Sequence, residues 1–228
     1  MPITTCVFDA YGTLFDVGAA ARQAASEPGA AAWADRWPRL AAHWRRKQLE
    51  YTWLRAVAGA HVDFWQVTQD GLDWALEAED LADPLLRERL LALYRELSAY
   101  PEVPGVLAGL KAAGLNCAVL SNGSPDMLAD AVRSAGLDDM LDAVLSVEQV
   151  GVFKPHRSVY DLVGRRFGTD PAQVMFVSSN GWDACSAAAY GFCAVWANRD
   201  SAPMDRLHGR PAHVVADLRA LADLLRRE

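Results

Sequence analysis

Residues 8–15 read FDAYGTLF, and they continue a run at positions 3–8 that reads ITTCVF. This run is apolar and β-branched, and Pro2 and Gly12 bound it, so it predicts a fully buried strand. A carboxylate at the end of such a strand, here Asp9, is costly unless it has a use. Because open α/β sheets bind ligands at the carboxyl ends of their strands, Asp9 is a candidate functional residue. A turn aspartate that caps the Gly12 loop explains these local residues equally well.

The rest of the chain divides into two kinds of sequence. From residue 99 onward, predicted strands and helices alternate, which indicates an α/β fold with a doubly wound, Rossmann-like parallel sheet. The later strands are expected at 116–120, 143–147, 173–177, 193–196 and 213–215, with helices such as 155–167 and 216–227. Residues 16–98 contain no convincing strand and favour helices. We therefore expect a core domain of residues 1–15 and 99–228, with residues 16–98 as an inserted helical-bundle cap over the strand ends.

Composition excludes several classes of protein. The chain has 228 residues and a net charge of −7, which argues against nucleic-acid binding. No apolar run is long enough to span a membrane, and the N-terminus enters a strand without a basic leader. The four cysteines form no Cys-x-x-Cys pair, so we expect reduced thiols and a cytoplasmic location.

Three further polar clusters follow predicted strands. Residues 121–125 read SNGSP, in which a serine cap and a first-turn proline leave backbone N–H groups free for an anion, although an ordinary capped turn fits as well. Lys154 precedes Pro155, so it should lie just outside the helix that Pro155 opens, as an active-site cation or as a solvated lysine. Residues 178–183 read SSNGWD, and its final Asp183 is either a functional carboxylate or a first-turn acid.

The pattern D-x-Y-G-T-L-F-D at residues 9–16 resembles the first motif of the haloacid dehalogenase superfamily. Phosphatases of that superfamily carry a second aspartate at the third position, which protonates the leaving oxygen; this chain has Tyr11. An alkoxide needs a proton to leave and a halide does not, so the loss of that acid favours carbon–halogen cleavage. The resemblance therefore points to the 2-haloacid dehalogenase branch.

The same resemblance implies roles for the later clusters. Ser121 and nearby backbone N–H groups would hold a substrate carboxylate, and Asn122 would help to hold the departing halide. Lys154 would sit beside the nucleophile, and Tyr160, six residues further on, would line the site. Ser178 stands where metal-dependent phosphatases have a magnesium-binding aspartate, so we expect no metal and no other cofactor.

The cap contributes one more matching segment. Residues 44–53 read WRRKQLEYTW and resemble the family's lid helix, whose substrate-binding arginine follows a tryptophan and maps to Arg45. Arg45 and Arg46 lie about 100° apart on a helix, so they cannot face the cleft equally, and Arg46 fits a solvated basic face. The helix predicted at 34–57 has two apolar stripes. They indicate either burial within the bundle or a homodimer formed through the cap helices.

Together these features imply hydrolysis of (S)-2-haloalkanoic acids to (R)-2-hydroxyalkanoic acids. Asp9 would displace the halide to form an aspartyl ester, which water would then hydrolyse. A magnesium-dependent phosphatase of the same superfamily and a catalytically silent oligomeric binding protein remain alternatives. The candidate catalytic residues are Asp9, Thr13, Lys154, Ser178, Asn180 and Asp183. The candidate substrate-binding residues are Tyr11, Arg45, Phe64, Ser121, Asn122, Tyr160 and Trp182.

Overall fold

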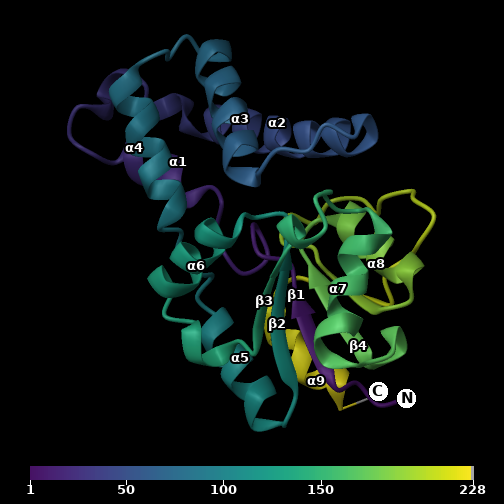
Figure 1. Cartoon of the computed structure of the whole chain (residues 1–228). Helices are drawn as coiled ribbons and strands as arrows, with labels where there is room; N and C mark the ends of the chain where they lie inside the picture. Colours follow the sequence, from purple (N-terminus) through teal and green to yellow (C-terminus); the bar gives the residue numbers. More distant parts are fainter. Residues whose placement is uncertain (227–228) are drawn as a thin grey trace.

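The computed structural model describes residues 1–226 as a parallel sheet with helices on both faces and further helices above the strand ends (Figure 1). The strands are β1 (Thr5–Phe8), β2 (Asn116–Ser121), β3 (Ala143–Ser146), β4 (Val174–Ser178), β5 (Cys193–Ala197) and β6 (His213–Val215). Their order in the sheet is β3-β2-β1-β4-β5-β6, and every neighbouring pair is parallel. The predicted doubly wound α/β sheet is confirmed.

The strand order reverses next to β1. From β1 the chain builds outward through β2 to β3, then crosses back to β4 on the other side of β1. Helices α5 (Val103–Ala112) and α9 (Leu221–Leu225) contact one another, and so do α7 (Arg157–Phe167) and α8 (Gly181–Tyr190). Right-handed crossovers place these two pairs on opposite faces of the sheet. The ends of β1 and β4 therefore flank the crevice where doubly wound sheets bind ligands.

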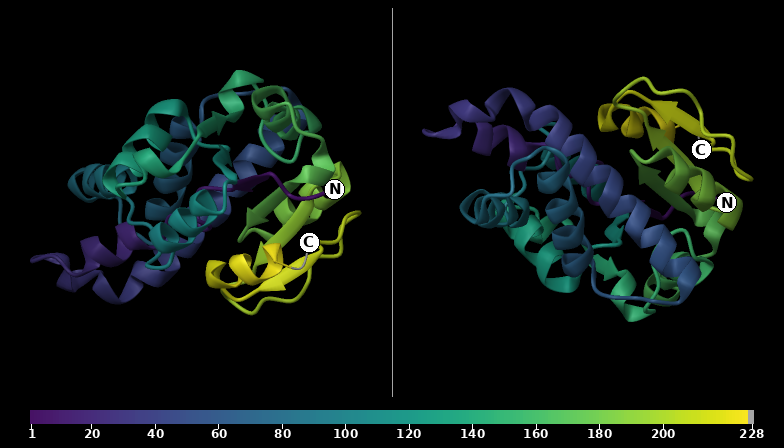
Figure 2. Two further views of the ribbon diagram at one scale, coloured as in Figure 1. Left: turned by 90° about the horizontal axis from the view of Figure 1, so that it is seen from below. Right: turned by 90° about the horizontal axis from the view of Figure 1, so that it is seen from above.

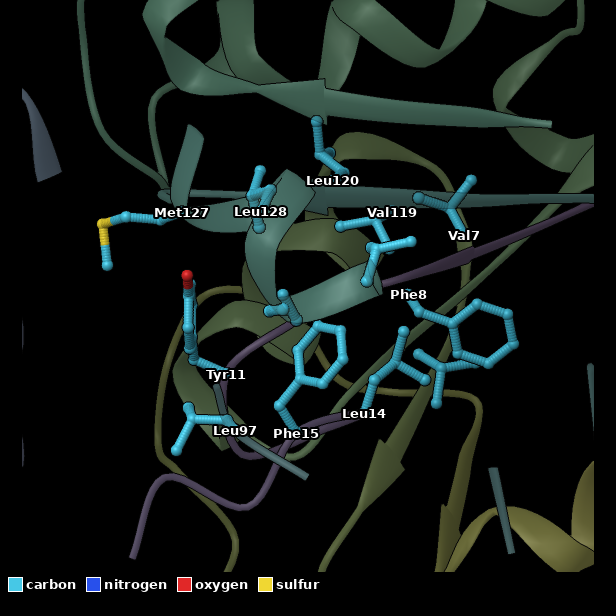
Figure 3. Packing of buried hydrophobic residues seen from close by; sticks show 14 of the residues in the cluster. Val7, Phe8, Tyr11, Leu14, Phe15, Leu97, Val119, Leu120, Met127 and Leu128 are labelled. Atoms are coloured by element: carbon cyan, nitrogen blue, oxygen red, sulfur yellow. The ribbon is translucent and has the colours of Figure 1, made fainter. Parts of the chain in front are cut away.

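The centre of the core surrounds β1, whose four residues are all buried. Figure 3 shows Val7 and Phe8 among side chains of the neighbouring β2, including Val119. The turn after the strand extends this packing through Leu14 and Phe15, which have no exposed surface. Burying each large apolar side chain stabilises the fold by roughly 1.5–3 kcal/mol. The loop that carries Asp9 is therefore held in place by the packing of its own buried side chains.

Four helices form the cap: α1 (Ala19–Ala25), α2 (Trp37–Ala58), α3 (Phe64–Ala78) and α4 (Pro84–Arg95). Helix α2 packs along α3, and from above it runs across the ends of the strands (Figure 2). The two connections between the cap and the sheet lie side by side, because Phe15 and Ala99 form an antiparallel bridge. The predicted helical cap after the first strand is thus confirmed. No helix within residues 1–226 is both long and apolar enough to cross a bilayer.

Two predicted helix limits were wrong. The helix expected to open at Pro155 begins at Arg157, because residues 154–156 form a turn and His156 caps the helix by accepting from the Ser158 backbone N–H. The last helix, expected over 216–227, is shorter: a 3-10 turn over Leu218–Ala220 leads into α9. Residue 227 of that prediction lies outside the described residues.

Candidate active site

The carboxylate of Asp9 lies at the end of β1 and is held by three donors. Its backbone N–H continues the sheet by donating to the Val177 carbonyl, at 2.9 Å. The side chain is nearly buried, and its Oδ2 accepts from Thr13 Oγ1 and from Asn180 Nδ2, each at 3.0 Å. Its Oδ1 accepts from Lys154 Nζ at 3.2 Å. Donors from three separate loops therefore fix the direction of one carboxylate.

Lys154 lies between two carboxylates. Its Nζ is 2.8 Å from Asp183 Oδ2 as well as 3.2 Å from Asp9, and the lysine side chain is 1% exposed. Burial disfavours the ammonium, but the charges of Asp183 and Asp9 outweigh burial, so the pKa of Lys154 is raised. The Tyr160 hydroxyl donates to Asp183 Oδ1 at 2.7 Å. Burial, reinforced by the charge of Asp9, raises the pKa of Asp183 despite Lys154 and Tyr160.

The loops after β1 and β4 are bound to one another. Thr13 Oγ1 accepts from the Ser179 N–H at 2.8 Å, and Ser178 Oγ accepts from the Asn180 N–H at 3.2 Å. Gly12 has a φ of 89°, and a Cβ on it would lie 3.0 Å from Ser179 Oγ. A glycine is therefore required here both by its conformation and by the close approach of the two loops.

The loop after β2 supplies the next wall. Ser121 Oγ accepts from the Gly123 N–H at 3.0 Å, and Asn122 Oδ1 accepts from the Lys154 N–H at 2.9 Å. A Cβ on Gly123 would lie 2.8 Å from Cε2 of Tyr11, so a larger residue at this position would collide with the Tyr11 ring. Since the oxygen of Asn122 is engaged, its amide NH₂ is the group that can donate to a ligand.

From the cap, Arg45 on α2 reaches down to the core. One terminal nitrogen donates to the Tyr11 carbonyl at 3.0 Å and to Asn180 Oδ1 at 3.2 Å, and the other donates to Gln48 Oε1 at 2.8 Å. Arg46 turns away and is more than half exposed: its guanidinium lies over the Trp74 ring at 5.0 Å. The cleft arginine is therefore Arg45.

Side chains of the cap and the core together enclose a small cavity. Its volume of about 10 Å³ holds roughly one water molecule, so a larger ligand requires the cap or the side chains to move. Two buried donors, Tyr11 OH and Trp182 Nε1, have no hydrogen-bond partner within residues 1–226. The lining residues are Asp9, Tyr11, Arg45, Leu49, Phe64, Ser121, Asn122, Asn180 and Trp182.

Comparison with known proteins identifies the family, because residues 3–191 match the model of the haloacid dehalogenase-like hydrolases. This chain belongs to that family. It is 43% identical over 227 residues to (S)-2-haloacid dehalogenase 1 of Pseudomonas sp. strain CBS-3, covering 99% of this chain and 98% of that one.

Solved structures of this hydrolase family share the same fold. The L-2-haloacid dehalogenase from Xanthobacter autotrophicus, with chloropropionic acid covalently bound, superimposes with a TM-score of 0.85 at 38% identity and covers 98% of both chains. A dehalogenase with an intermediate complex gives a TM-score of 0.91 at 40% identity, covering 97% of this chain and 96% of the other. The resemblance read from the motifs is confirmed.

Most residues predicted for this hydrolase converge on one place. Thr13, Lys154, Asn180 and Asp183 are joined to Asp9 directly or through Lys154. Tyr160 donates to Asp183 and is not among the residues that line the cavity. Ser178 is fully buried beneath the Asn180 backbone.

Sequence reasoning missed three residues of the site: Gln48, Leu49 and Ser179. Gln48 lies three positions after Arg45, and this spacing pairs side chains on a helix, so it could have been found. Ser179 stands inside the cluster read at 178–183, but nothing in the sequence distinguished it from its neighbours.

The residues present in this hydrolase do not suit a divalent cation. Within residues 1–226, no three His, Cys, Asp or Glu side chains are grouped as metal ligands require. The space between the Asp9 and Asp183 carboxylates is taken by the Lys154 ammonium, and Ser178 offers a hydroxyl already engaged by backbone. The Lys154 ammonium therefore occupies the position at which the two carboxylates would otherwise attract a metal cation.

Proposed function

We propose that this protein hydrolyses (S)-2-haloalkanoic acids to (R)-2-hydroxyalkanoic acids through an aspartyl ester, without a metal ion. The observation that carries the proposal is the Asp9 carboxylate, which lines a cavity opposite an arginine and has no acid partner at position 11. (S)-2-Haloacid dehalogenases about 40% identical over nearly the whole chain support the same reaction.

In the first step, Asp9 attacks the α-carbon of the substrate. One carboxylate oxygen forms a bond to carbon as the carbon–halogen bond breaks, and the halide leaves with the electron pair. Because this is a single displacement, it inverts the carbon centre. Two anions must approach one another, and the charges of Arg45 and Lys154, with the amino end of α6 (Pro125–Ser134), offset their repulsion.

The departing halide needs donors that are already in place. Three candidates come from different elements: the Arg45 guanidinium, the amide NH₂ of Asn122 and the indole N–H of Trp182. Among the residues that the structure describes, the Trp182 Nε1 donor has no partner, so its burial costs free energy until a ligand accepts from it. In a site that excludes water, such donors stabilise developing negative charge strongly.

In the second step, water hydrolyses the ester at its carbonyl carbon. The water proton passes to Asp183, whose pKa is raised by burial, and an ammonium 3.2 Å from Asp9 polarises the carbonyl. Ser178 and Asn180 are the candidates to orient the water. As the acyl–oxygen bond breaks, Asp183 returns the proton to the leaving oxygen, which frees the hydroxy acid. The new Asp9 carboxyl group then loses its proton to solvent, which regenerates the Asp9 carboxylate.

Two measurements test the mechanism. Chloride release is assayed with both enantiomers of 2-chloropropionate in the presence of a chelator, and only the (S) acid should react. A single turnover in heavy-oxygen water should place the label in the Asp9 carboxylate. Label that enters the product directly on the first turnover contradicts the ester. Phosphate-ester hydrolysis that the chelator abolishes would indicate the phosphatase, and no turnover of either substrate would indicate a binding protein.

We also propose that the protein is a homodimer formed through its cap. The carboxyl-terminal half of α2 exposes Trp53, Leu54 and Val57, the last at 91%. Large exposed apolar patches often mark protein contacts. Sedimentation of Val57→Glu against the unchanged protein tests this: a dimer should become a monomer.

The paired connections at Phe15 and Ala99 support the domain limits proposed above, residues 16–98 for the cap. Cys6, Cys117 and Cys185 form no disulfide within residues 1–226, which supports a cytoplasmic location.

A further inference from the structure

A chain of hydrogen bonds inside the cap ends at the Arg45 guanidinium. Gln48 lies one turn beyond Arg45 on α2, and its side chain is 1% exposed. Its Oε1 accepts from Arg45 at 2.8 Å, and its Nε2 donates to Thr68 Oγ1 on α3 at 2.8 Å. Thr68 in turn donates to the Phe64 carbonyl at 2.7 Å. A continuous path therefore joins the interior of the cap to the cleft.

The direction of each hydrogen bond in this chain is fixed by chemistry. A guanidinium has only donors, so Gln48 must present its carbonyl oxygen to Arg45. The hydroxyl proton of Thr68 is committed to Phe64, so Thr68 can only accept from Gln48. Rotating the Gln48 amide by half a turn would break the match at both ends. The amide is therefore held in one orientation, and so is the arginine nitrogen bonded to it.

A third contact completes the surroundings of Gln48. The hydroxyl of Tyr94 on α4 lies 3.0 Å from Nε2 and 3.2 Å from Oε1 of the amide. The Tyr94 ring stacks on Tyr11, with centroids 5.6 Å apart. Gln48 thus has partners from three cap helices, and a buried network with every member satisfied is rigid.

The polar partners of Arg45 are all neutral. They are the Gln48 amide oxygen, the Tyr11 carbonyl and the Asn180 amide oxygen. Within residues 1–226, Arg45 takes part in no ion pair. A carboxylate at position 48 would hold the guanidinium more tightly, but it would cancel the charge that an anionic ligand needs. Glutamine orients the arginine and leaves its charge available.

We propose that Gln48 is a positioning residue that aims Arg45 at the substrate without neutralising it, a role that rests on the dehalogenase function proposed above. Gln48 itself touches neither the substrate nor the reacting atoms. It acts through the direction and the net charge of the guanidinium.

Two substitutions separate direction from charge. Gln48→Met keeps the volume but removes the hydrogen bonds to Arg45, Thr68 and Tyr94. The guanidinium of Arg45 then loses its fixed direction, so kcat for (S)-2-chloropropionate should fall about 100-fold. Gln48→Glu keeps an acceptor for Arg45 but adds a negative charge, so KM should rise about tenfold or more. Thr52→Val is the matched control, because Thr52 is also buried, one turn further along α2. Its kcat and KM should stay unchanged.

Several outcomes would overturn the proposal. Unchanged kcat and KM in the two Gln48 variants would do so, and so would a similar loss in Thr52→Val. If Gln48→Met does not fold, Thr68→Val replaces it, because that change removes the acceptor that orients the amide, together with the hydroxyl's bond to the Phe64 carbonyl, and leaves Gln48 itself in place. The unchanged protein is assayed first. If it releases no halide, the proposed function fails, and Gln48 is judged by propionate-induced stabilisation against heat. Equal stabilisation in all variants then contradicts its role.

Discussion

The two cations of the site differ in how their charge is used. Lys154, from the core, lies between Asp9 and Asp183 and is almost fully buried, so its charge is matched within the protein. Arg45, from the cap, is held by neutral oxygens and forms no ion pair with any residue the structure describes. The core cation therefore has carboxylate partners within the protein, whereas the cap cation has none among the described residues.

This difference assigns separate tasks to the two halves. A matched, buried charge orients the nucleophile and supports the fold, because removing either member leaves a buried charge alone. In the proposed mechanism, an unmatched charge at the cavity wall would draw in an anionic substrate and stabilise the halide as it leaves. Substitutions in the core should therefore alter both stability and turnover, and substitutions at the cap cation should alter turnover alone.

The largest expected effect comes from Asp9, on which both halves act. Asp9→Asn keeps the shape of the side chain but removes the nucleophilic charge, so halide release should fall by about 10⁴-fold or more. Chloride release over hours measures this. Turnover near that of the unchanged protein would mean that Asp9 is not the group attacked at carbon.

Removing the core cation should affect folding most. Lys154→Met leaves two buried carboxylates without their ammonium, which should lower the free energy of unfolding by about 3–5 kcal/mol. Because the pKa of Lys154 is raised above 10.5, its contribution is complete below that pH and is lost as pH rises through the raised value. Urea unfolding of both proteins should show a constant difference from pH 7 to 9 that shrinks above pH 10.5. A difference that grows at high pH would contradict this assignment.

Removing the cap cation should affect catalysis alone. Arg45→Met should lower kcat/KM for (S)-2-chloropropionate by about 10²–10³-fold, the usual cost of losing a donor to developing charge. Its melting temperature should stay close to that of the unchanged protein, because the lost bonds are to neutral groups. Arg46→Met is the matched control: it lies next in the helix but packs on Trp74, so turnover should be unaffected. Equal losses of kcat/KM in Arg45→Met and Arg46→Met would contradict the assignment of Arg45 as the cleft arginine.

The smallest effect is expected at Tyr160, whose hydroxyl donates to Asp183, the outer carboxylate of the core pair. Tyr160→Phe removes the 2.7 Å hydrogen bond to Asp183 and leaves Lys154 in place. The protein should lose about 0.5–1.5 kcal/mol of stability. In single-turnover experiments, ester hydrolysis should slow more than ester formation, because Asp183 acts in the second step. Slowing of ester formation alone would place Tyr160 with the cap half instead.

Much of the core half of the site could be predicted from sequence because several of its residues lie at the end of a strand. Asp9, Asn122, Ser178 and Asn180 come directly after apolar runs, and parallel strands bring such positions to one edge. The error at Pro155 has a local cause, since a turn at residues 154–156 delays the helix to Arg157. Nothing in the sequence at Lys154 and Pro155 indicates such a turn.

The cap half could be predicted only in outline. The apolar stripe that includes Leu40 and Trp44 is buried as expected, but the choice between Arg45 and Arg46 depends on how the helix is rotated over the core. Periodicity fixes which residues share a face and not which face meets a distant loop. The spacing of Gln48 from Arg45 indicates that the two side chains can pair, but its partners on α3 and α4 are remote in sequence and could not be predicted.

The pairing of Phe15 with Ala99 has a consequence for how the enzyme works through a cycle. Only Leu14 separates this bridge from Thr13, whose hydroxyl donates to the Asp9 carboxylate. A rotation of the cap about this bridge would therefore act close to the backbone that carries Asp9. We therefore expect substrate entry and the orientation of the attacking oxygen to be coupled. A chain with its cap open would then also have a poorly oriented Asp9 carboxylate.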